Sequence, residues 1–256
     1  MLSLFPISDA NPTRTFPVIT ILLIAANAFV FLFVQPDFGS SFEADVYFVQ
    51  EAPIPCQIEG DCPDGLQAVD RIVEIPDRTF ASFVASSVFS TFLHAGWLHI
   101  IGNMLFLWVF GNNVEDYLGK VKFVLFYLAG GLAATFAHVF THLDSVAPGV
   151  GASGAVAAVM GAYLLLFPKA RVNVLVTMFI FITVIQLSAI VVLGIWFAYQ
   201  FLYAYQEATV ATGVAWMAHV GGFVFGLVGI FLLGGRPHRA QPAWEPRWGR
   251  SGRWVR

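Results

Sequence analysis

Charged residues are scarce in this sequence. Only 11% of its 256 residues are Asp, Glu, Lys or Arg, whereas soluble globular domains carry about a quarter. Hydrophobic residues make up 58%, which excludes an ordinary soluble domain and indicates a protein that crosses a membrane several times. The apolar runs do not alternate in polarity, which excludes an outer-membrane barrel. No internal repeat suggests a repeat-built transporter.

Several apolar runs reach or approach the roughly 20 residues that a membrane-spanning helix needs. Six candidate spans cover residues 16–34, 98–114, 123–140, 151–167, 172–205 and 214–233. The fifth run is too long for one straight helix, so part of it must tilt, break or lie at the membrane interface. We therefore expect an all-α membrane protein with six transmembrane helices, since lipid requires backbone hydrogen bonds to be made within helices.

Lysine and arginine are nearly absent from one side of this topology. Eleven of the 13 lie on the side of the two termini, and the other two lie in the first outside loop, at about 35–81. Because cytoplasmic loops are rich in Lys and Arg, we expect both termini to be cytoplasmic. The chain would comprise an N-terminus (1–15), a six-helix domain (16–235) and a basic tail (236–256), either disordered or lying along the anionic leaflet.

Only two cysteines are present, Cys56 and Cys62, both in the acidic outside loop. A disulfide between them is permitted on the outer face of a membrane, and two free thiols are the alternative. The segment contains no histidine, which disfavours a metal site.

Polar side chains within the spans are few, and each is a functional candidate because it is costly to bury in lipid. His99 and Asn103 lie four residues apart on one face of the second span, and His94 lies just before them. Ser153 begins the fourth span and His219 lies in the sixth. All three spans run from the outer face inward, so these side chains would meet at a similar depth near the outer face.

Small residues would let the fourth and sixth spans pack closely. A G-x-x-x-G pair begins three residues after His219, and glycines and alanines follow Ser153. Such residues allow membrane helices to approach backbone to backbone, which would bring Ser153 Oγ within hydrogen-bonding distance of His219. The glycines concerned are Gly154, Gly161, Gly222 and Gly226.

These groups favour nucleophilic catalysis. A serine hydroxyl becomes a nucleophile when a neighbouring base accepts its proton, and histidine suits that task at neutral pH. No carboxylate lies in the fourth or sixth span, so Ser153 and His219 would form a dyad rather than a triad. Asn103, His99 and the free N–H groups at the start of the fourth span would stabilise an oxyanion. Gly151 would leave room for a bent substrate chain.

Structural roles are the alternative. A serine in a membrane helix is often a packing residue that bonds its own backbone, and a histidine is often a structural hydrogen-bonding group. His138 and His142 could bind a metal, but no carboxylate or cysteine accompanies them in their span. A histidine-lined transporter would usually show acidic residues in mid-membrane or repeats, and neither is visible.

Three motifs resemble those of the rhomboid family of intramembrane serine proteases. "FLHAGWLHIIGNMLFLWVFGNNVEDYLG" resembles the family's second-span signature, "GASGAVAAVMGAY" the segment of the nucleophile, and "AHVGGFVFG" the segment of the base. They occur in the family's order. The resemblance implies Ser153 as nucleophile, His219 as general base, His99 and Asn103 at the oxyanion site, and a supporting role for His94.

The resemblance also implies an endopeptidase that cuts single-span membrane proteins in or near their transmembrane segments. It would need no metal or cofactor, bind no nucleic acid, and lie in a prokaryotic cell membrane with its site opening toward the outer face. Substrate would enter between spans two and five, past a cap loop at 206–213. A rhomboid-like pseudoenzyme that binds helices is the alternative, although such forms usually lack the serine or the histidine. The oligomeric state is not predicted.

The chain departs from the family pattern in its first outside loop, which lacks the Trp-Arg pair of some members, and at the position four residues after the serine. Some members carry a tyrosine four residues after the serine, where its ring stacks on the catalytic histidine. This chain has Ala157 there, so either another group holds the His219 ring or the ring is loosely held.

Overall fold

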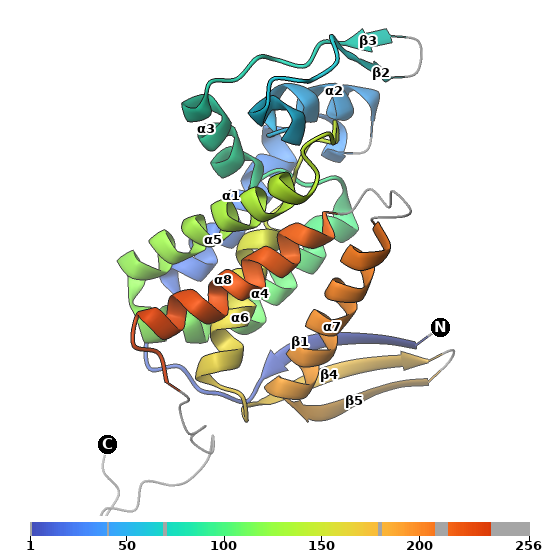
Figure 1. The fold of residues 1–256 in the computed structure, drawn as a ribbon. Helices are drawn as coiled ribbons and strands as arrows, with labels where there is room; N and C mark the ends of the chain where they lie inside the picture. Colours follow the sequence, from blue (N-terminus) through green and yellow to red (C-terminus); the bar gives the residue numbers. More distant parts are fainter. Residues whose placement is uncertain (1, 40, 69–70, 179–180, 208–214, 237–256) are drawn as a thin grey trace, which may run out of the picture.

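The computed structural model describes residues 2–39, 41–68, 71–178, 181–207 and 215–236. Six helices pack as a bundle, with a layer of short elements at one end and a three-stranded sheet at the other (Figure 1). The bundle consists of α1 (Val18–Phe33), α4 (Trp97–Leu118), α5 (Lys120–Thr141), α6 (Ser153–Leu166), α7 (Ala189–Glu207) and α8 (Trp216–Leu232).

The helices of the bundle overlap the six apolar runs of the sequence but are mostly short. Within the described residues, α5 alone is both long and apolar enough to cross a membrane by length and composition. The apolar helices α1, α6 and α8 fall below that length, as does the apolar stretch Ala189–Tyr203 of α7. The helical bundle is therefore established, while the count of six membrane spans stays a prediction.

The fifth apolar run is broken, as its length required, and the break corrects the all-α expectation. Residues 171–188 form a hairpin of β4 (Arg171–Met178) and β5 (Phe181–Ser188). These strands are rich in β-branched residues, which suit a pleated surface. The helix α7 consequently begins at Ala189 rather than near residue 172.

The N-terminal segment completes this sheet. Strand β1 (Leu2–Asp9) pairs antiparallel with β4, which gives the strand order β1-β4-β5. Val172 and Val174 of β4 are buried and belong to the main hydrophobic core. The sheet thus closes the end of the bundle that lies away from the start of α6 (Figure 1).

A half-buried carboxyl group joins the sheet to the bundle. Asp9 Oδ2 accepts hydrogen bonds from the Tyr163 hydroxyl of α6 at 2.5 Å and from Asn113 Nδ2 of α4 at 2.9 Å. Burial is the largest influence on Asp9 and raises its pKa to about 6. The far end of the serine-bearing helix is therefore tied to the N-terminal strand.

A second carboxylate, which is buried, joins α4 to α1. Glu115 of α4 is only 2% exposed and accepts hydrogen bonds from the N–H groups of Ile19 and Thr20 at 3.0 and 2.8 Å. These N–H groups lie in the first turn of α1, where no partner exists within the helix. Glu115 therefore holds α4, which carries His99 and Asn103, in register with α1.

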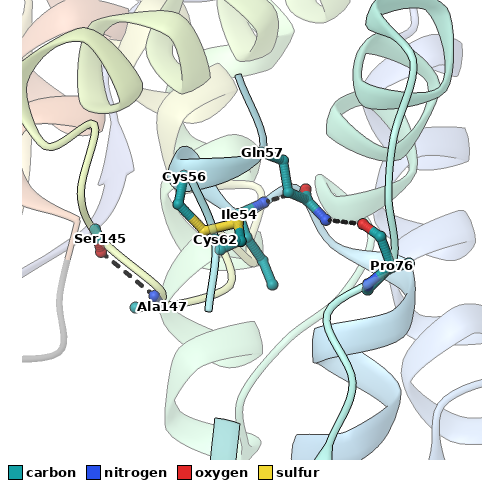
Figure 2. Close-up of a disulfide and its surroundings, with 7 residues drawn as sticks. All are labelled: Ile54, Cys56, Gln57, Cys62, Pro76, Ser145 and Ala147. Atoms are coloured by element: carbon teal, nitrogen blue, oxygen red, sulfur yellow. Dashed lines mark hydrogen bonds between the residues drawn. A yellow bond between two sulfur atoms is a disulfide. The ribbon is translucent and has the colours of Figure 1, made fainter. Parts of the chain in front are cut away.

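The long outside loop is folded. It contains η1 (Pro36–Gly39), α2 (Phe42–Glu51), η2 (Pro55–Ile58), β2 (Leu66–Ala68) and β3 (Arg71–Val73), and α3 (Phe80–Ser90) follows it. A disulfide joins Cys56 to Cys62 (Figure 2). In the same view Ala147 N donates to Ser145 Oγ at 3.3 Å, beside the disulfide.

Helix α6 is the centre of the bundle, and every residue from 154 to 163 is buried. It contacts α8 backbone to backbone. A Cβ atom added at Gly226 would lie 2.0 Å from the Ala158 carbonyl oxygen, and one at Gly222 would lie 2.2 Å from the Gly154 oxygen. From the other side, a Cβ at Gly161 would lie 2.2 Å from the oxygen of Phe223. Glycine is therefore required at this contact.

Candidate active site

The structure brings Ser153 and His219 together. Ser153 is the first residue of α6, and His219 lies in the first turn of α8. Ser153 Oγ lies 2.8 Å from His219 Nε2, a normal hydrogen-bond distance. The backbone contact at Gly154 and Gly222 fixes the two helices close beside this pair.

The opposite nitrogen of the His219 ring also has a partner. His219 Nδ1 lies 2.7 Å from Gln200 Oε1, a side chain of α7 that is only 6% exposed. Two indole rings flank the imidazole: Trp196 of α7 at a centroid distance of 6.1 Å and Trp216 of α8 at 6.0 Å. Besides Ser153 of α6, the His219 ring is therefore contacted by side chains of α7 and α8.

Polar groups of α4 approach the start of α6. His99 Nδ1 accepts a hydrogen bond from the Ala95 N–H at 3.3 Å, so His99 Nε2 carries the proton. A Cβ atom at Gly151 would lie 2.8 Å from that nitrogen, which places the His99 N–H two residues before Ser153. Asn103 is 7% exposed and gives one amide hydrogen to the His99 carbonyl oxygen at 2.9 Å. The second amide hydrogen of Asn103 can be donated to another acceptor.

Gly151 lies in the turn that leads into α6. Its φ of 120° lies in a region that side-chain-bearing residues rarely adopt. The space where a Cβ would stand is bounded by the His99 ring, 2.6 Å away at Cε1. The glycine therefore allows both the close approach of this ring and the turn before Ser153, while its role in leaving room for a substrate chain stays a prediction.

His94 lies behind His99 rather than beside Ser153. It is fully buried, and its ring meets the His99 ring edge to face at 5.1 Å. The Gln35 side chain holds the His94 backbone through both of its functional groups, accepting from the N–H at 3.0 Å and donating to the oxygen at 2.8 Å. This supports a role in packing and in orienting His99.

A cavity of about 50 Å³ adjoins Ser153. Its wall is formed by small residues of α5 and α6, by the segment 149–151 and by His138. The rings of His138 and His142 stack at 4.9 Å, and no group of three or more potential metal-ligating residues occurs in the described parts of the chain. Ser153 is itself one of the residues that line this cavity.

The segment that leads into α6 is anchored by the folded outside loop. Gly149 N donates to the Pro53 oxygen at 2.9 Å, and Cys56 N donates to the Ser145 oxygen at 3.1 Å. Closer to the serine, Gly151 N donates to the oxygen of Ser90 in α3 at 3.0 Å. The folded outside loop (η1 to β3, with the disulfide drawn in Figure 2), called the outer layer below, therefore supports the turn that positions Ser153.

Comparison with known proteins identifies the family of this site. The family model described as "Rhomboid domain" matches residues 83–236, which is more than half of the chain. The chain belongs to the rhomboid family. The matched region contains Ser153, His219, His99, Asn103 and Gln200.

Curated relatives agree with this assignment. The rhomboid chain is similar to Presenilin-associated rhomboid-like protein A, mitochondrial, of Danio rerio, at 32% identity over 55% of this chain and 35% of the relative. It is 30% identical to Rhomboid protein 1, mitochondrial, of Saccharomyces cerevisiae over 59% of this chain and 42% of that protein. Rhomboid protease GluP of Bacillus subtilis is 40% identical over 28% of this chain and 14% of GluP.

The matches cover less than half the length of each of these relatives. They support a membrane protein of the rhomboid family, a family that includes a named protease. Since the relatives include both mitochondrial and bacterial proteins, the location in a prokaryotic cell membrane stays a prediction.

Sequence reasoning missed three residues of this rhomboid site: Gln200, Trp196 and Gln35. Gln200 is a polar residue within a long apolar run, a signal that could have marked it. The predicted cap loop at 206–213 falls largely on residues 208–214, which lie outside the described residues, as does the tail from residue 237.

Proposed function

We propose that this rhomboid is an intramembrane serine endopeptidase that hydrolyses peptide bonds in or near the transmembrane segments of single-span membrane proteins. The proposal rests chiefly on the 2.8 Å separation of Ser153 Oγ and His219 Nε2. A serine and a histidine at this distance on two tightly packed helices form the arrangement that activates a hydroxyl nucleophile. The name of the bacterial relative, a rhomboid protease, supports the same reaction class.

In the first step His219 Nε2 takes the Ser153 proton as Oγ bonds to the scissile carbonyl carbon. The carbonyl oxygen becomes an oxyanion. When the tetrahedral intermediate collapses, the C–N bond breaks and His219 returns the proton to the leaving amine. A water molecule then attacks the acyl-serine, His219 takes its proton, and the ester bond to Oγ breaks as Oγ is reprotonated.

The oxyanion requires fixed donors close to Ser153. His99 Nε2–H and the free amide hydrogen of Asn103 are side-chain candidates on α4. Ala152, which precedes the first turn of α6, offers no side-chain acceptor to the N–H groups there, so the Ser153 backbone N–H is a third candidate. All of these groups are uncharged donors, which suits a site within a membrane.

We further propose that both termini are cytoplasmic and that the site opens toward the outer face. The distribution of the 13 Lys and Arg residues supports this orientation. The outer layer, which contains the disulfide, and the sheet that contains the N-terminal strand also lie at opposite ends of the bundle (Figure 1), and disulfides persist on the oxidising side of a membrane. The prokaryotic location rests on the resemblance to bacterial members.

The test is cleavage of a fluorescent single-span substrate by the purified protein reconstituted in lipid vesicles. Ser153→Ala and His219→Ala should each lower turnover by about 10³-fold or more. Ser82→Ala and His142→Ala change the same residue types away from the site and should retain wild-type rates. Circular dichroism and the melting midpoint establish that each variant is folded.

Cleavage that persists in folded Ser153→Ala would reject the proposal. Binding of the substrate by the wild-type protein without any cleavage would instead favour a pseudoenzyme. In either case mass spectrometry of the reaction products distinguishes a true cut in the transmembrane segment from a contaminating protease.

A further inference from the structure

The environment of His219 contains a polar group that the serine–histidine pair does not account for. Gln200 Oε1 lies 2.7 Å from His219 Nδ1, and the glutamine is almost fully buried in the wall of the site. Burying an amide in a membrane bundle is costly unless it forms such a bond. Gln200 therefore needs an explanation in the chemistry of the site or in its packing.

The direction of this hydrogen bond determines which nitrogen of His219 is basic. A carbonyl oxygen can only accept, so Nδ1 must carry the proton that Gln200 Oε1 receives. Nε2 is then the unprotonated nitrogen and can accept the hydroxyl proton of Ser153, 2.8 Å away. The opposite tautomer would place a hydrogen on Nε2 facing Oγ and would remove the base.

The helical spacing of α7 places the Gln200 amide next to the His219 ring. Trp196 and Gln200 lie four residues apart and hence on one face of the helix, and both face His219. Phe197 stacks on Phe223 of α8 at a centroid distance of 4.6 Å. This stack fixes how far α7 stands from the helix that carries the base.

The same contacts explain how the His219 ring is held although residue 157 is an alanine and not a tyrosine. This residue is fully buried in α6 and carries no ring that could stack on His219. The imidazole is instead oriented from the side of α7, by one hydrogen bond and by the indole of Trp196. A hydrogen bond sets both the ring plane and the tautomer, whereas stacking sets the plane alone.

We infer that Gln200 is the positioning residue of the catalytic pair, holding His219 in the tautomer that can deprotonate Ser153. The inference rests on the proposed function, because it assigns a role in that reaction. The site then comprises serine, histidine and glutamine from α6, α8 and α7, with a neutral amide in the place that a carboxylate occupies in soluble serine proteases.

The test compares Gln200→Leu, Gln200→Asn and Gln200→Glu with Phe201→Ala, a substitution at an exposed neighbour on the same helix. Leucine has no acceptor, and asparagine is one methylene too short to reach Nδ1. Both should lower kcat by about 10- to 100-fold with little change in KM, because the tautomer and orientation of the base are lost. Glutamate keeps the acceptor at the same reach and should restore kcat to within about threefold of wild type.

A second readout is the rate at which an alkyl fluorophosphonate labels Ser153. Oγ bonds to phosphorus, fluoride leaves, and His219 takes the serine proton, so the rate reports activation of the nucleophile without a protein substrate. It should fall in the Leu and Asn variants in proportion to kcat. Phe201→Ala should label and cleave like wild type.

Wild-type kcat and labelling in Gln200→Leu would overturn the inference. A second result would also overturn it: a loss of kcat in Gln200→Leu that comes with a lower melting midpoint and that Gln200→Glu does not restore. That pattern would indicate that Gln200 acts through packing alone. Failure of the proposed function looks different, because the wild-type protein itself would then neither cleave nor label at Ser153.

Discussion

Helix α8 carries His219 and helix α7 contacts it, but the two helices are attached to the bundle in different ways. Helix α8 meets α6 backbone to backbone, so that a single added methyl group at Gly226 would fall 2.0 Å from a carbonyl oxygen. Helix α7 meets α8 through side chains, with the stack of Phe197 on Phe223 at its centre. A Cβ atom added at Gly194 of α7 would meet nothing within 4 Å.

Both helices also expose large apolar side chains, those of α8 at Val224, Val228, Phe231 and Leu232. Much of α7 is exposed and apolar, as expected for a helix that faces lipid, with large side chains at Ile190, Ile195, Tyr199, Phe201 and Leu202. The nucleophile and the base thus lie on a pair of helices that cannot separate without breaking backbone contacts. The group that orients the base lies on a helix whose contacts can repack, because side chains can change rotamer and backbones in contact cannot.

The largest effect should follow from breaking the α6–α8 contact. Gly226→Val places three carbon atoms against the Ala158 backbone, which cannot move aside, and should cost about 3 kcal/mol or more in stability. We expect a large drop in the melting midpoint and loss of cleavage. A substitution on α7, Gly194→Ala, should instead leave the midpoint unchanged or raise it by the equivalent of less than about 1 kcal/mol, whereas the same substitution on α8, Gly226→Ala, should lower it.

Equal losses of stability in Gly226→Val and Gly194→Ala would contradict the contrast between the helices. A normal midpoint in Gly226→Val would contradict the close contact itself. Gly226→Ala is a useful intermediate, since it adds one methyl group at the same position.

The next largest effect should be a pH dependence of stability at the other end of α6, where Asp9 accepts a hydrogen bond from the Tyr163 hydroxyl. Burial raises the pKa of Asp9 to about 6 in the folded protein, from an ordinary value of 3.8. The folded state therefore binds this proton more tightly than the unfolded state, and its stability falls as the pH rises from about 4 to about 6. The difference amounts to about 3 kcal/mol.

Asp9→Asn cannot ionise, so the variant should lose this pH dependence and melt higher than wild type above pH 6. Melting midpoints in detergent at pH 4.5 and pH 7 provide the measurement. Asp61→Asn, a change at an exposed residue of the outer layer, is the control and should keep the wild-type slope. Parallel slopes for wild type and Asp9→Asn would contradict the role of Asp9.

Helix α4 supplies groups to the site without close backbone contact to α8, and Asn103 tests its contribution. If its free amide hydrogen stabilises the oxyanion, Asn103→Ala should lower kcat by about 10²-fold, close to 2.7 kcal/mol of transition-state stabilisation. KM should change little, since the oxyanion forms only during the reaction. An unchanged kcat in a folded Asn103→Ala variant would remove this residue from the oxyanion site.

The smallest effect should come from the outer layer. Removing the Cys56–Cys62 disulfide, by reduction or in Cys56→Ser/Cys62→Ser, frees a short loop and should cost about 2 kcal/mol. The contacts of this layer with the segment before Ser153 should loosen, and we expect a lower midpoint with at most a severalfold loss of turnover. A reductant that leaves the midpoint of wild type unchanged would show that the layer is held without the disulfide.

Much of the site follows from local sequence. The motif around Ser153, the histidine three residues ahead of a G-x-x-x-G pair, and H-x-x-x-N in the second span each contain their chemistry within one helix. The spacing of these residues on an α-helix sets the face they share. The excessive length of the fifth apolar run likewise predicts a break, although not its form.

The sheet and the orientation of the base could not be predicted in this way. Strand β1 pairs with β4 across more than 160 residues of sequence, and no local signal specifies a partner that far away. The face of α7 that meets His219 depends on where the helix begins. A start at Ala189, rather than at residue 172, follows from the hairpin that the pairing with β1 stabilises.

The amino-acid sequence alone determined that this chain is a helical membrane protein and which serine and histidine it could use, because hydrophobicity and helical spacing are local properties. Only the tertiary structure decided that Gln200 faces His219 and that Asp9 ties β1 to α6. Those contacts join elements that are far apart in the sequence. Their relative positions depend on how all the helices and strands pack together, and no single segment specifies that packing.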